Sequence, residues 1–304
     1  MDFYFWFHDN VRRHLPSGIR RGIRRRRAWL MSVYGKWRIR RSVTRIFGTQ
    51  FRRSRDRLEL DLTYACNLHC FNCNRSCEQA KDNGHMSVGQ IRHFLAESRE
   101  RQQRWRMIRV IGGEPTIHPQ FLEIVDLLVA YKKSYSPGTR IVVCTNGHGD
   151  RVQRALSMLP SEVVIENTAK QSHIQPDFLA FNVAPVDSRE FAEADYANGC
   201  SIIKKCGFGL SPSGYYPCGP AGGIDRVFGF NLGRKSLPSP DDDMHEELRR
   251  FCAVCGIFRR TPEPKPLLEP VMSATWSRAY ARWAAKRPVL TAFPEQSPDS
   301  ESES

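Results

Sequence analysis

The sequence contains no apolar run of the roughly 18 residues that a membrane-spanning helix requires. It also lacks the pattern of a secretory signal, because the aromatic start MDFYFWF has no basic residues before it and Asp2, His8 and Asp9 interrupt it. Its ten cysteines are spread over 304 residues, too thinly for a small secreted domain held together by disulfides. These absences predict a cytoplasmic protein in a reducing compartment, where clustered thiols more often bind metal.

Acidic residues are scarce at the N-terminal end. Residues 1–57 contain 17 Lys and Arg but only 3 Asp and Glu, whereas the rest of the chain carries 29 of each sign. The arginines alternate with apolar and aromatic residues, which predicts a basic amphipathic arm over residues 1–56. Three roles stay open: a solvated arm packed on the main domain, peripheral docking on an anionic membrane surface or acidic partner, and nucleic-acid binding. The last is least favoured because no known reader motif accompanies the charge.

Beyond the arm, predicted strands and helices alternate. Apolar runs and alternation indicate strands at 57–63, 107–115, 140–147, 162–167 and 178–185, and helical spacing indicates helices at 86–103, 119–133 and 150–159. Repeated strand–helix units predict an α/β fold with a parallel sheet, in which ligands gather at the carboxyl ends of the strands.

The amino-acid composition changes from about residue 196. Glycines and cysteines crowd the next segment, which predicts a small loop-rich extension. Within it SPSGYY signals a hairpin, and RRFCAVCGIF contains a CxxC pair. A proline-rich linker, a helix at 273–287 and a polar tail follow. We therefore expect four parts: the arm 1–56, the α/β domain 57–195, a cysteine-containing region 196–262, and the linker, helix and disordered acidic tail 263–304.

Three cysteines follow the first predicted strand in the stretch CNLHCFNC. Cys66, Cys70 and Cys73 form a CxxxCxxC pattern. Zinc sites usually combine two half-sites, and no matching half lies nearby. Three thiolates on an iron–sulfur cube leave one iron free to bind another molecule.

Together with GGEPTIHP at 112–119 after the second strand, this loop resembles the radical S-adenosylmethionine (SAM) superfamily. The resemblance implies a partial (β/α)6 TIM-like barrel, a [4Fe-4S] cluster on Cys66, Cys70 and Cys73, and SAM held at Gly112, Gly113, Glu114 and Pro115. In this family the reduced cluster cleaves SAM to a 5′-deoxyadenosyl radical, which takes a hydrogen atom from substrate. One position departs from the family pattern: Asn72 precedes the third cysteine, where an aromatic residue is usual.

Several residues near the motifs receive separate predictions. We expect the glycines to let the backbone approach SAM closely and the Glu114 carboxylate to accept hydrogen bonds from its ammonium group. Cys77 is predicted not to be a ligand, because a fourth local thiolate would close the open iron. Cys144 is predicted to lie in the core, and His69 and His118 to be turn or surface residues.

A second set of cysteines lies in residues 196–262. The stretch CGFGLSPSGYYPC resembles the start of a SPASM or the shorter twitch extension, and no cysteines follow CAVC, which favours a twitch region with one auxiliary [4Fe-4S] cluster. Its predicted ligands are Cys218, Cys252 and Cys255, with either Cys200 or Cys206 as the fourth. A zinc site is the alternative, since four thiolates also suit zinc.

Three functions compete at this point. The first is net oxidation of a small molecule such as a sugar or cyclitol, with an external one-electron reductant. The second is maturation of a ribosomal peptide or protein. The third is a metal-stabilised scaffold without activity. The sequence identifies no catalytic acid or base.

Overall fold

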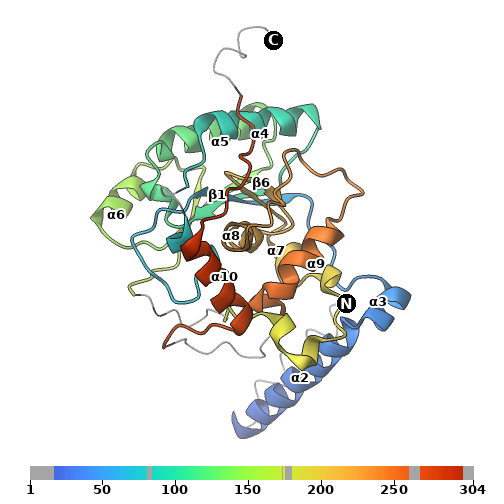
Figure 1. The fold of residues 1–304 in the computed structure, drawn as a ribbon. Coiled ribbons are helices and arrows are strands. Elements are labelled where there is room, and N and C mark those ends of the chain that lie inside the picture. The colour runs from blue at the N-terminus through green and yellow to red at the C-terminus, as the bar shows by residue number, and fades with distance from the viewer. Residues whose placement is uncertain (1–16, 81–83, 173, 175–179, 260–267, 297–304) are drawn as a thin grey trace.

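The computed structural model describes residues 17–80, 84–172, 174, 180–259 and 268–296 (Figure 1). The aromatic start, most of the proline-rich linker and the polar tail predicted from sequence lie outside these residues. Within the described part of the chain, no helix is both long and apolar enough to cross a bilayer.

A six-stranded sheet with the order β4-β3-β2-β1-β5-β6 forms the centre of the fold. Neighbouring strands are parallel from β4 to β5, and β6 returns antiparallel to β5 as a hairpin. The strands are β1 (Arg57–Thr63), β2 (Met107–Gly112), β3 (Arg140–Thr145), β4 (Val164–Asn167), β5 (Phe208–Ser211) and β6 (Gly214–Tyr216). This arrangement confirms the predicted α/β class and is consistent with a partial TIM-like barrel. Since β5 and β6 follow residue 195, the sheet includes part of the predicted cysteine-containing region.

Three helices cover the outer face of the sheet (Figure 1). They are α4 (Val88–Glu100), α5 (Phe121–Ser134) and α6 (Asp150–Ser157). Ser87 begins α4 with a capping box, in which its hydroxyl accepts from the Gln90 amide while the Gln90 side chain accepts from the Ser87 amide. The helices pack on the alternate apolar residues of β1, Leu58, Leu60 and Leu62, which are completely buried.

The opposite face of the sheet is covered by helices from the C-terminal half. They are α7 (Ser201–Lys205), α8 (Gly219–Phe228), α9 (His245–Val254) and α10 (Ala274–Ala285). Short 3-10 turns connect the elements: η1 (Cys77–Gln79), η3 (Pro115–Ile117), η4 (Pro185–Asp187), η5 (Arg189–Phe191), η6 (Tyr196–Asn198) and η7 (Gly256–Arg259). A second apolar cluster holds this layer together around Trp276, whose indole donates to the Val254 carbonyl at 2.7 Å.

Two expectations for this half were wrong. Residues 180–185, the described part of a predicted strand, form a turn leading into η4. Phe181 and Ala184 are buried in the apolar cluster around Trp276, so the hydrophobic run packs on helices instead of pairing in the sheet. Conversely, the glycine-rich stretch after Cys218, predicted to be loop-rich, forms the helix α8, and its glycines make the close packing contacts described below.

The N-terminal arm forms two helices, α2 (Ser17–Arg38) and α3 (Arg41–Phe47). Ile39 and Val43 are buried, and Ile39 joins an apolar cluster with Phe191, Ile203 and Leu248. The end of the arm is therefore packed against the main body, whereas α2 runs along the edge of the molecule outside both helical layers (Figure 1).

Candidate active site

The three motif cysteines follow the carboxyl end of β1. Cys66, Cys70 and Cys73 line a cavity of about 290 Å³, and Gly112 and Gly113 at the end of β2 line the same cavity. The parallel strands β1 and β2 end side by side, which explains how two motifs some 40 residues apart in sequence meet.

The cysteines lie in the segment of residues 64–77 that follows β1, which we call the radical loop, and their thiols influence one another. Burial raises the pKa of Cys66 to about 11, and the neighbouring Cys73 and Cys70 thiols add to this rise. The hydrogen bond between the Cys73 and Cys77 thiols, whose sulfur atoms are 3.8 Å apart, lowers the pKa of Cys73 to about 5. A fourth thiol therefore lies directly beside the three motif cysteines, and its non-ligand role stays a prediction.

The two turn glycines are required by contact with the radical loop. Gly112 adopts φ 136°, and a Cβ there would lie 2.1 Å from the Thr63 carbonyl oxygen. A Cβ on Gly113 would lie 2.3 Å from the Ala65 carbonyl oxygen, to which the next residue, Glu114, donates its amide at 2.8 Å. The glycines thus bring the β2 turn onto the cysteine loop, a reason for glycine that the sequence did not reveal.

Glu114 is completely buried at this turn. Its Oε1 accepts from the Thr116 and Thr145 hydroxyls at 2.8 and 2.9 Å, and its Oε2 accepts from the Asn146 amide at 2.7 Å. The carboxylate therefore fastens the β2 turn, where Pro115 begins η3, to the end of β3. Its expected contact with the SAM ammonium group stays a prediction beside this observed structural role.

Asn72, the departure from the family pattern, occupies the left-handed region with φ 54°. Its side-chain amide donates to the Asn182 side chain at 3.0 Å and to the Val271 carbonyl, and it accepts from the Val271 amide at 3.1 Å. Asparagine tolerates this backbone conformation better than an aromatic residue does. The substitution thus ties the radical loop to the C-terminal segment.

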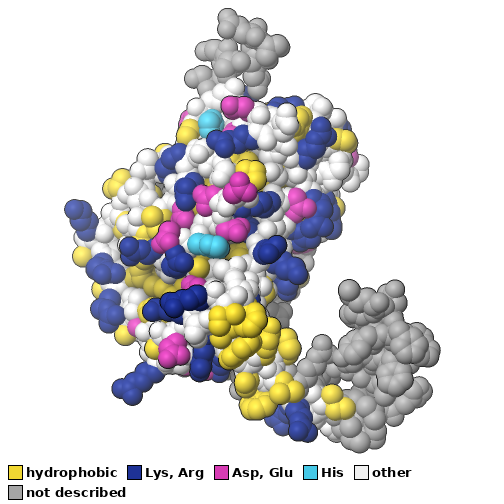
Figure 2. Space-filling model, turned by 90° about the vertical axis from the view of Figure 1, so that its right-hand side faces the viewer, with side chains coloured by type: hydrophobic (Ala, Val, Ile, Leu, Met, Phe, Trp, Pro, Cys, Tyr) yellow, Lys and Arg dark blue, Asp and Glu magenta, His cyan; other side chains and the backbone are white. Residues whose placement is uncertain are grey.

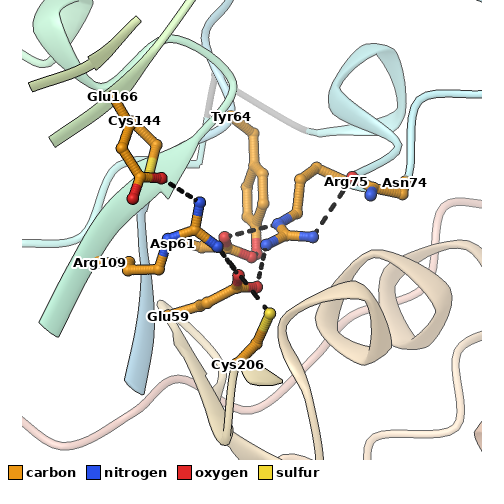
Figure 3. A network of polar contacts seen from close by, with 9 residues as sticks. All are labelled: Glu59, Asp61, Tyr64, Asn74, Arg75, Arg109, Cys144, Glu166 and Cys206. Atoms are coloured by element: carbon orange, nitrogen blue, oxygen red, sulfur yellow. Dashed lines mark hydrogen bonds and ion pairs between the residues drawn. The ribbon is translucent and has the colours of Figure 1, made fainter. Parts of the chain in front are cut away.

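The inner face of the sheet carries a buried charge network, shown in Figure 3. Arg75, two residues after the last motif cysteine, donates to Glu59 at 2.6 Å and to Asp61 at 2.8 Å, and all three side chains are 4% exposed or less. Arg109 on β2 donates to Glu59 at 2.8 Å and to Glu166 on β4 at 2.7 Å. The network thus runs from the cysteine loop across the sheet from β1 to β4.

Two further thiols flank Arg109. Cys206 Sγ lies 3.9 Å from Arg109 Nη1, and Cys144 Sγ lies 3.5 Å from Glu166 Oε2 (Figure 3). Burial raises the pKa of each to about 12. Glu59, Arg109, Cys144 and Cys206 also line the 290 Å³ cavity, so part of its wall is polar and charged.

Four cysteines of the second set are grouped. Burial raises the pKa of the Cys252 thiol, and the neighbouring Cys200, Cys255 and Cys218 thiols raise it further. The fifth, Cys206, lies instead in the charge network beside Arg109. Among the described residues, no three His, Cys, Asp or Glu side chains converge as closely as a single metal ion requires. The structure thus brings Cys200, and not Cys206, to the three cysteines that the sequence favoured.

A buried arginine lies beside these four cysteines. Arg53 is 7% exposed, its pKa is lowered to about 10 by burial, and the neighbouring Cys218 thiol opposes that shift. Its Nη2 bonds the Asp243 carbonyl, while Nε and Nη1 are buried without a hydrogen-bond partner in the described part of the chain. A thiolate-ligated cluster is anionic, so a cation with unused donors at this place fits such a group. Sequence reasoning missed Arg53 among the many arginines of the arm.

Helix α8 connects the two groups of cysteines. Cys218 is its N-cap residue, and Arg226 near its end donates to the Arg75 and Ser76 carbonyls of the radical loop. A Cβ on Gly219 would lie 2.3 Å from Glu59 Oε2, and one on Gly223 would lie 2.9 Å from the Arg75 backbone. The same glycines made the sequence of α8 resemble a loop. In the structure they allow the helix to lie directly on the charge network.

Comparison with known proteins identifies the region around the first cysteine group. Residues 60–164 match the radical SAM superfamily. This segment is a radical SAM domain. The cofactors of such domains are a [4Fe-4S] cluster and SAM, and the three grouped thiols beside the Gly112–Gly113 turn fit that pair.

The relatives of the chain share only a segment with it. An 85-residue stretch is 40% identical to the mycofactocin maturase MftC of Mycobacterium tuberculosis and makes up 27% of this chain and 21% of that protein. The MftC of Mycobacterium ulcerans is 40% identical over 74 residues, 24% of this chain and 19% of that protein. The similarity thus spans about a fifth of the length of these maturases.

A solved structure is also similar to the chain. The crystal structure of BtrN in complex with AdoMet and 2-DOIA has 12% identity and a TM-score of 0.38, over 71% of this chain and 93% of that one.

Proposed function

We propose that this protein uses its radical SAM domain to oxidise a small polar molecule bound in the 290 Å³ cavity. The observation that carries the proposal is the composition of that cavity. Its walls combine the motif cysteines and the glycine turn with the Glu59–Arg109 ion pair. The groups that hold the radical cofactors and charged groups able to orient a hydroxylated or amino-bearing substrate therefore face the same space.

In this proposal Cys66, Cys70 and Cys73 hold the radical cluster, and the backbone of Gly112 and Gly113 borders the SAM site. When bound, cluster and SAM supply the radical that removes a hydrogen atom from the substrate. The chain itself orients the substrate through Glu59 and Arg109.

The second cofactor in the proposal is an auxiliary [4Fe-4S] cluster on Cys200, Cys218, Cys252 and Cys255, within a twitch-like region of residues 196–262. Its contribution when bound is to accept the second electron of the oxidation, the substrate proton passing to a base. Arg53 supplies positive charge and unused N–H donors beside it. The proximity of these four thiols to one another, with Arg53 beside Cys218 and Cys252, supports the assignment.

Anaerobic reconstitution tests both cofactors. We expect about eight irons per chain and Mössbauer spectra of [4Fe-4S] clusters. Replacing Cys66, Cys70 and Cys73 by alanine should remove about half of the iron and abolish formation of 5′-deoxyadenosine from SAM with dithionite. The Cys77→Ala variant should keep its iron. Stoichiometric zinc with about four irons would refute the auxiliary cluster and leave the radical one.

Similarity to a maturase favours a second candidate function, modification of a peptide. The two candidates differ in what stimulates SAM cleavage above its slow rate without substrate. Extract of the producing cells, divided into a small-molecule fraction and a peptide fraction, provides both probes. Stimulation by the peptide fraction alone, and its loss after protease treatment, would replace oxidation of a small molecule by peptide maturation.

A further inference from the structure

We propose that α2 and α3 form a docking surface for an anionic lipid bilayer, with α2 lying in the plane of the membrane interface. This inference is independent of the reaction in the cavity. It begins with large apolar side chains that the fold leaves in water. Trp29 is 62% exposed, Trp37 44% and Phe47 62%.

Most of the exposed apolar residues of α2 lie on one side of the helix. At about 100° per residue, Met31 lies outside an arc of roughly 140° that holds the other six, Ile23 near the start of the helix and five towards its end. These five are Trp29, Leu30, Val33, Tyr34 and Trp37, each at least 44% exposed. An isolated exposed apolar residue needs no explanation, but a continuous apolar stripe on an outer helix does.

The apolar stripe continues onto α3. The rings of Tyr34 and Trp37 are 5.9 Å apart, and those of Trp37 and Phe47 are 6.2 Å apart. Arg38 fixes the bend by donating to the Gly48 carbonyl at 2.9 Å and to the Phe47 carbonyl at 3.1 Å. We call this combined surface of Trp29, Leu30, Val33, Tyr34, Trp37 and Phe47 the arm surface.

The arm surface is held in place by the opposite side of the arm. The Arg41 amide donates to the Glu193 carbonyl at 2.9 Å, and the Asp195 amide donates to the Ile39 carbonyl at 2.7 Å. Lys36, at the edge of the apolar arc, also forms an ion pair with Glu190. Because these contacts and the buried Ile39 and Val43 attach the arm to the body, the arm surface is not needed for that attachment.

Basic side chains surround the arm surface. On the helical projection, Arg25 and Lys36 lie at one edge of the apolar arc and Arg38 at the other. Figure 2 shows Lys and Arg side chains close to the hydrophobic side chains gathered low on this face of the molecule. Arg41 and Arg45 of α3 additionally line a cavity of about 430 Å³ with Arg249 and Asp195, and the three arginines give it a net positive charge for a lipid phosphate.

This combination identifies the occupant. Tryptophan and tyrosine, apolar with one polar atom, favour the boundary between acyl chains and headgroups, and flanking arginines attract anionic lipid. An acidic protein partner would match the charge, but it would not require so many exposed aromatic and aliphatic side chains in one stripe. The excess of basic residues in residues 1–57, 17 against 3, adds attraction over a longer range.

Flotation of the full-length reconstituted protein with phosphatidylcholine vesicles, with or without phosphatidylglycerol, tests the proposal. We expect binding only with the anionic lipid, and loss of binding when salt rises from 0.1 to 1 M, because the screening length falls from about 10 to about 3 Å. The double variant Trp29→Glu, Trp37→Glu should bind at least about tenfold more weakly. The matched control Val289→Glu replaces a residue that is 91% exposed elsewhere and should bind like the unmodified protein.

Other outcomes would overturn the proposal. Equal flotation with neutral vesicles, or unchanged flotation of the double variant, would contradict it. Tight binding of polyglutamate without vesicle binding would assign the surface to an acidic protein. A concentration-dependent dimer that the double variant abolishes, again without vesicle binding, would assign it to a second copy. If the double variant fails to fold, Arg25→Gln with Arg26→Gln, two exposed positions, tests the electrostatic part by the same flotation.

Discussion

Arg75 donates from Nη2 to Glu59 Oε2 at 2.6 Å, with both side chains only 4% exposed. The pair joins the residue just beyond the radical cysteines to the inner face of β1. Burial alone would lower the pKa of Arg75, but Asp61 and Glu59 raise it well above its usual value, so the guanidinium stays charged. The position of the cysteine loop therefore depends on a buried ion pair, which is costly to leave half-made.

The first prediction follows from that cost. Arg75→Met leaves the buried Asp61 without its ion-pair partner and Glu59 with Arg109 alone, and it should lower the free energy of unfolding by about 3–5 kcal/mol. Arg106→Met, which breaks the exposed pair with Asp56, should cost about 0–1 kcal/mol. Urea denaturation of both variants, in the same cofactor state, measures the difference. Adding Glu59→Gln and Asp61→Asn should restore much of the loss, and an equally small effect of both arginine variants would contradict the argument.

The sequence predicted strands and helices of the α/β domain well where their patterns depend on residues close together in the chain. The alternation of leucines in residues 57–63 and the helical spacing in residues 86–103 depend on near neighbours only, and β1 and α4 were confirmed within these ranges. In contrast, Phe181 and Ala184 are apolar because they meet α10, a contact between segments far apart in sequence. No local periodicity distinguishes such a run from a buried strand.

The candidate site was predictable where it follows a motif and not where it depends on tertiary packing. The sequence could indicate Cys66, Cys70 and Cys73 from their spacing. It could not show that Glu59 and Arg75 pair in the buried charge network. Their contact forms only when the fold brings β1, the radical loop and α8 together, and nothing near either residue in the sequence indicates it. The same reason left Cys200 and Cys206 indistinguishable.

The second prediction separates those two cysteines. Cys200→Ala should lose the iron of the auxiliary cluster, because its thiol lies among Cys218, Cys252 and Cys255. Cys206→Ala should keep that iron, since Cys206 lies beside Arg109. Iron assay and Mössbauer spectra of the two variants, prepared in parallel, provide the comparison. Equal iron loss in both, or loss in Cys206→Ala alone, would exclude the assignment of Cys200.

The third prediction concerns Arg53. Reduction adds negative charge to a cluster, and a nearby cation with free donors favours that form. Arg53→Met should therefore lower the reduction potential of the auxiliary cluster by on the order of 60 mV, equivalent to a tenfold change for one electron. Arg52→Met changes the preceding, exposed arginine and serves as the control. Potentiometric titration followed by EPR measures both, and identical potentials would show that Arg53 does not face the cluster.

The last prediction concerns pH and His118, whose side chain is 4% exposed near the end of the GGEP turn. Its Nε2 lies 2.9 Å from the Met86 carbonyl and must donate, while its Nδ1 accepts from the Gln120 amide at 3.0 Å. The bond to Nδ1 requires the neutral ring, because a protonated Nδ1 cannot accept. Burial lowers its pKa, and the ring of His85, 5.0 Å away and also lowered in pKa by burial, would add repulsion if charged.

A histidine pKa that is lower in the folded state means that the unfolded chain binds more protons. The stabilising contribution of His118 is therefore complete above the unfolded pKa of about 6.5 and is lost as the pH falls below it. We expect the free energy of unfolding to decrease between pH 7 and pH 5, and His118→Gln, although less stable at pH 7, to lose less over that range. His93→Gln, a partly exposed residue on α4, is the control and should lose as much as the unmodified protein. Urea unfolding at several pH values measures these slopes, and parallel curves for the His118 variant and the unmodified protein would contradict the role of the neutral ring.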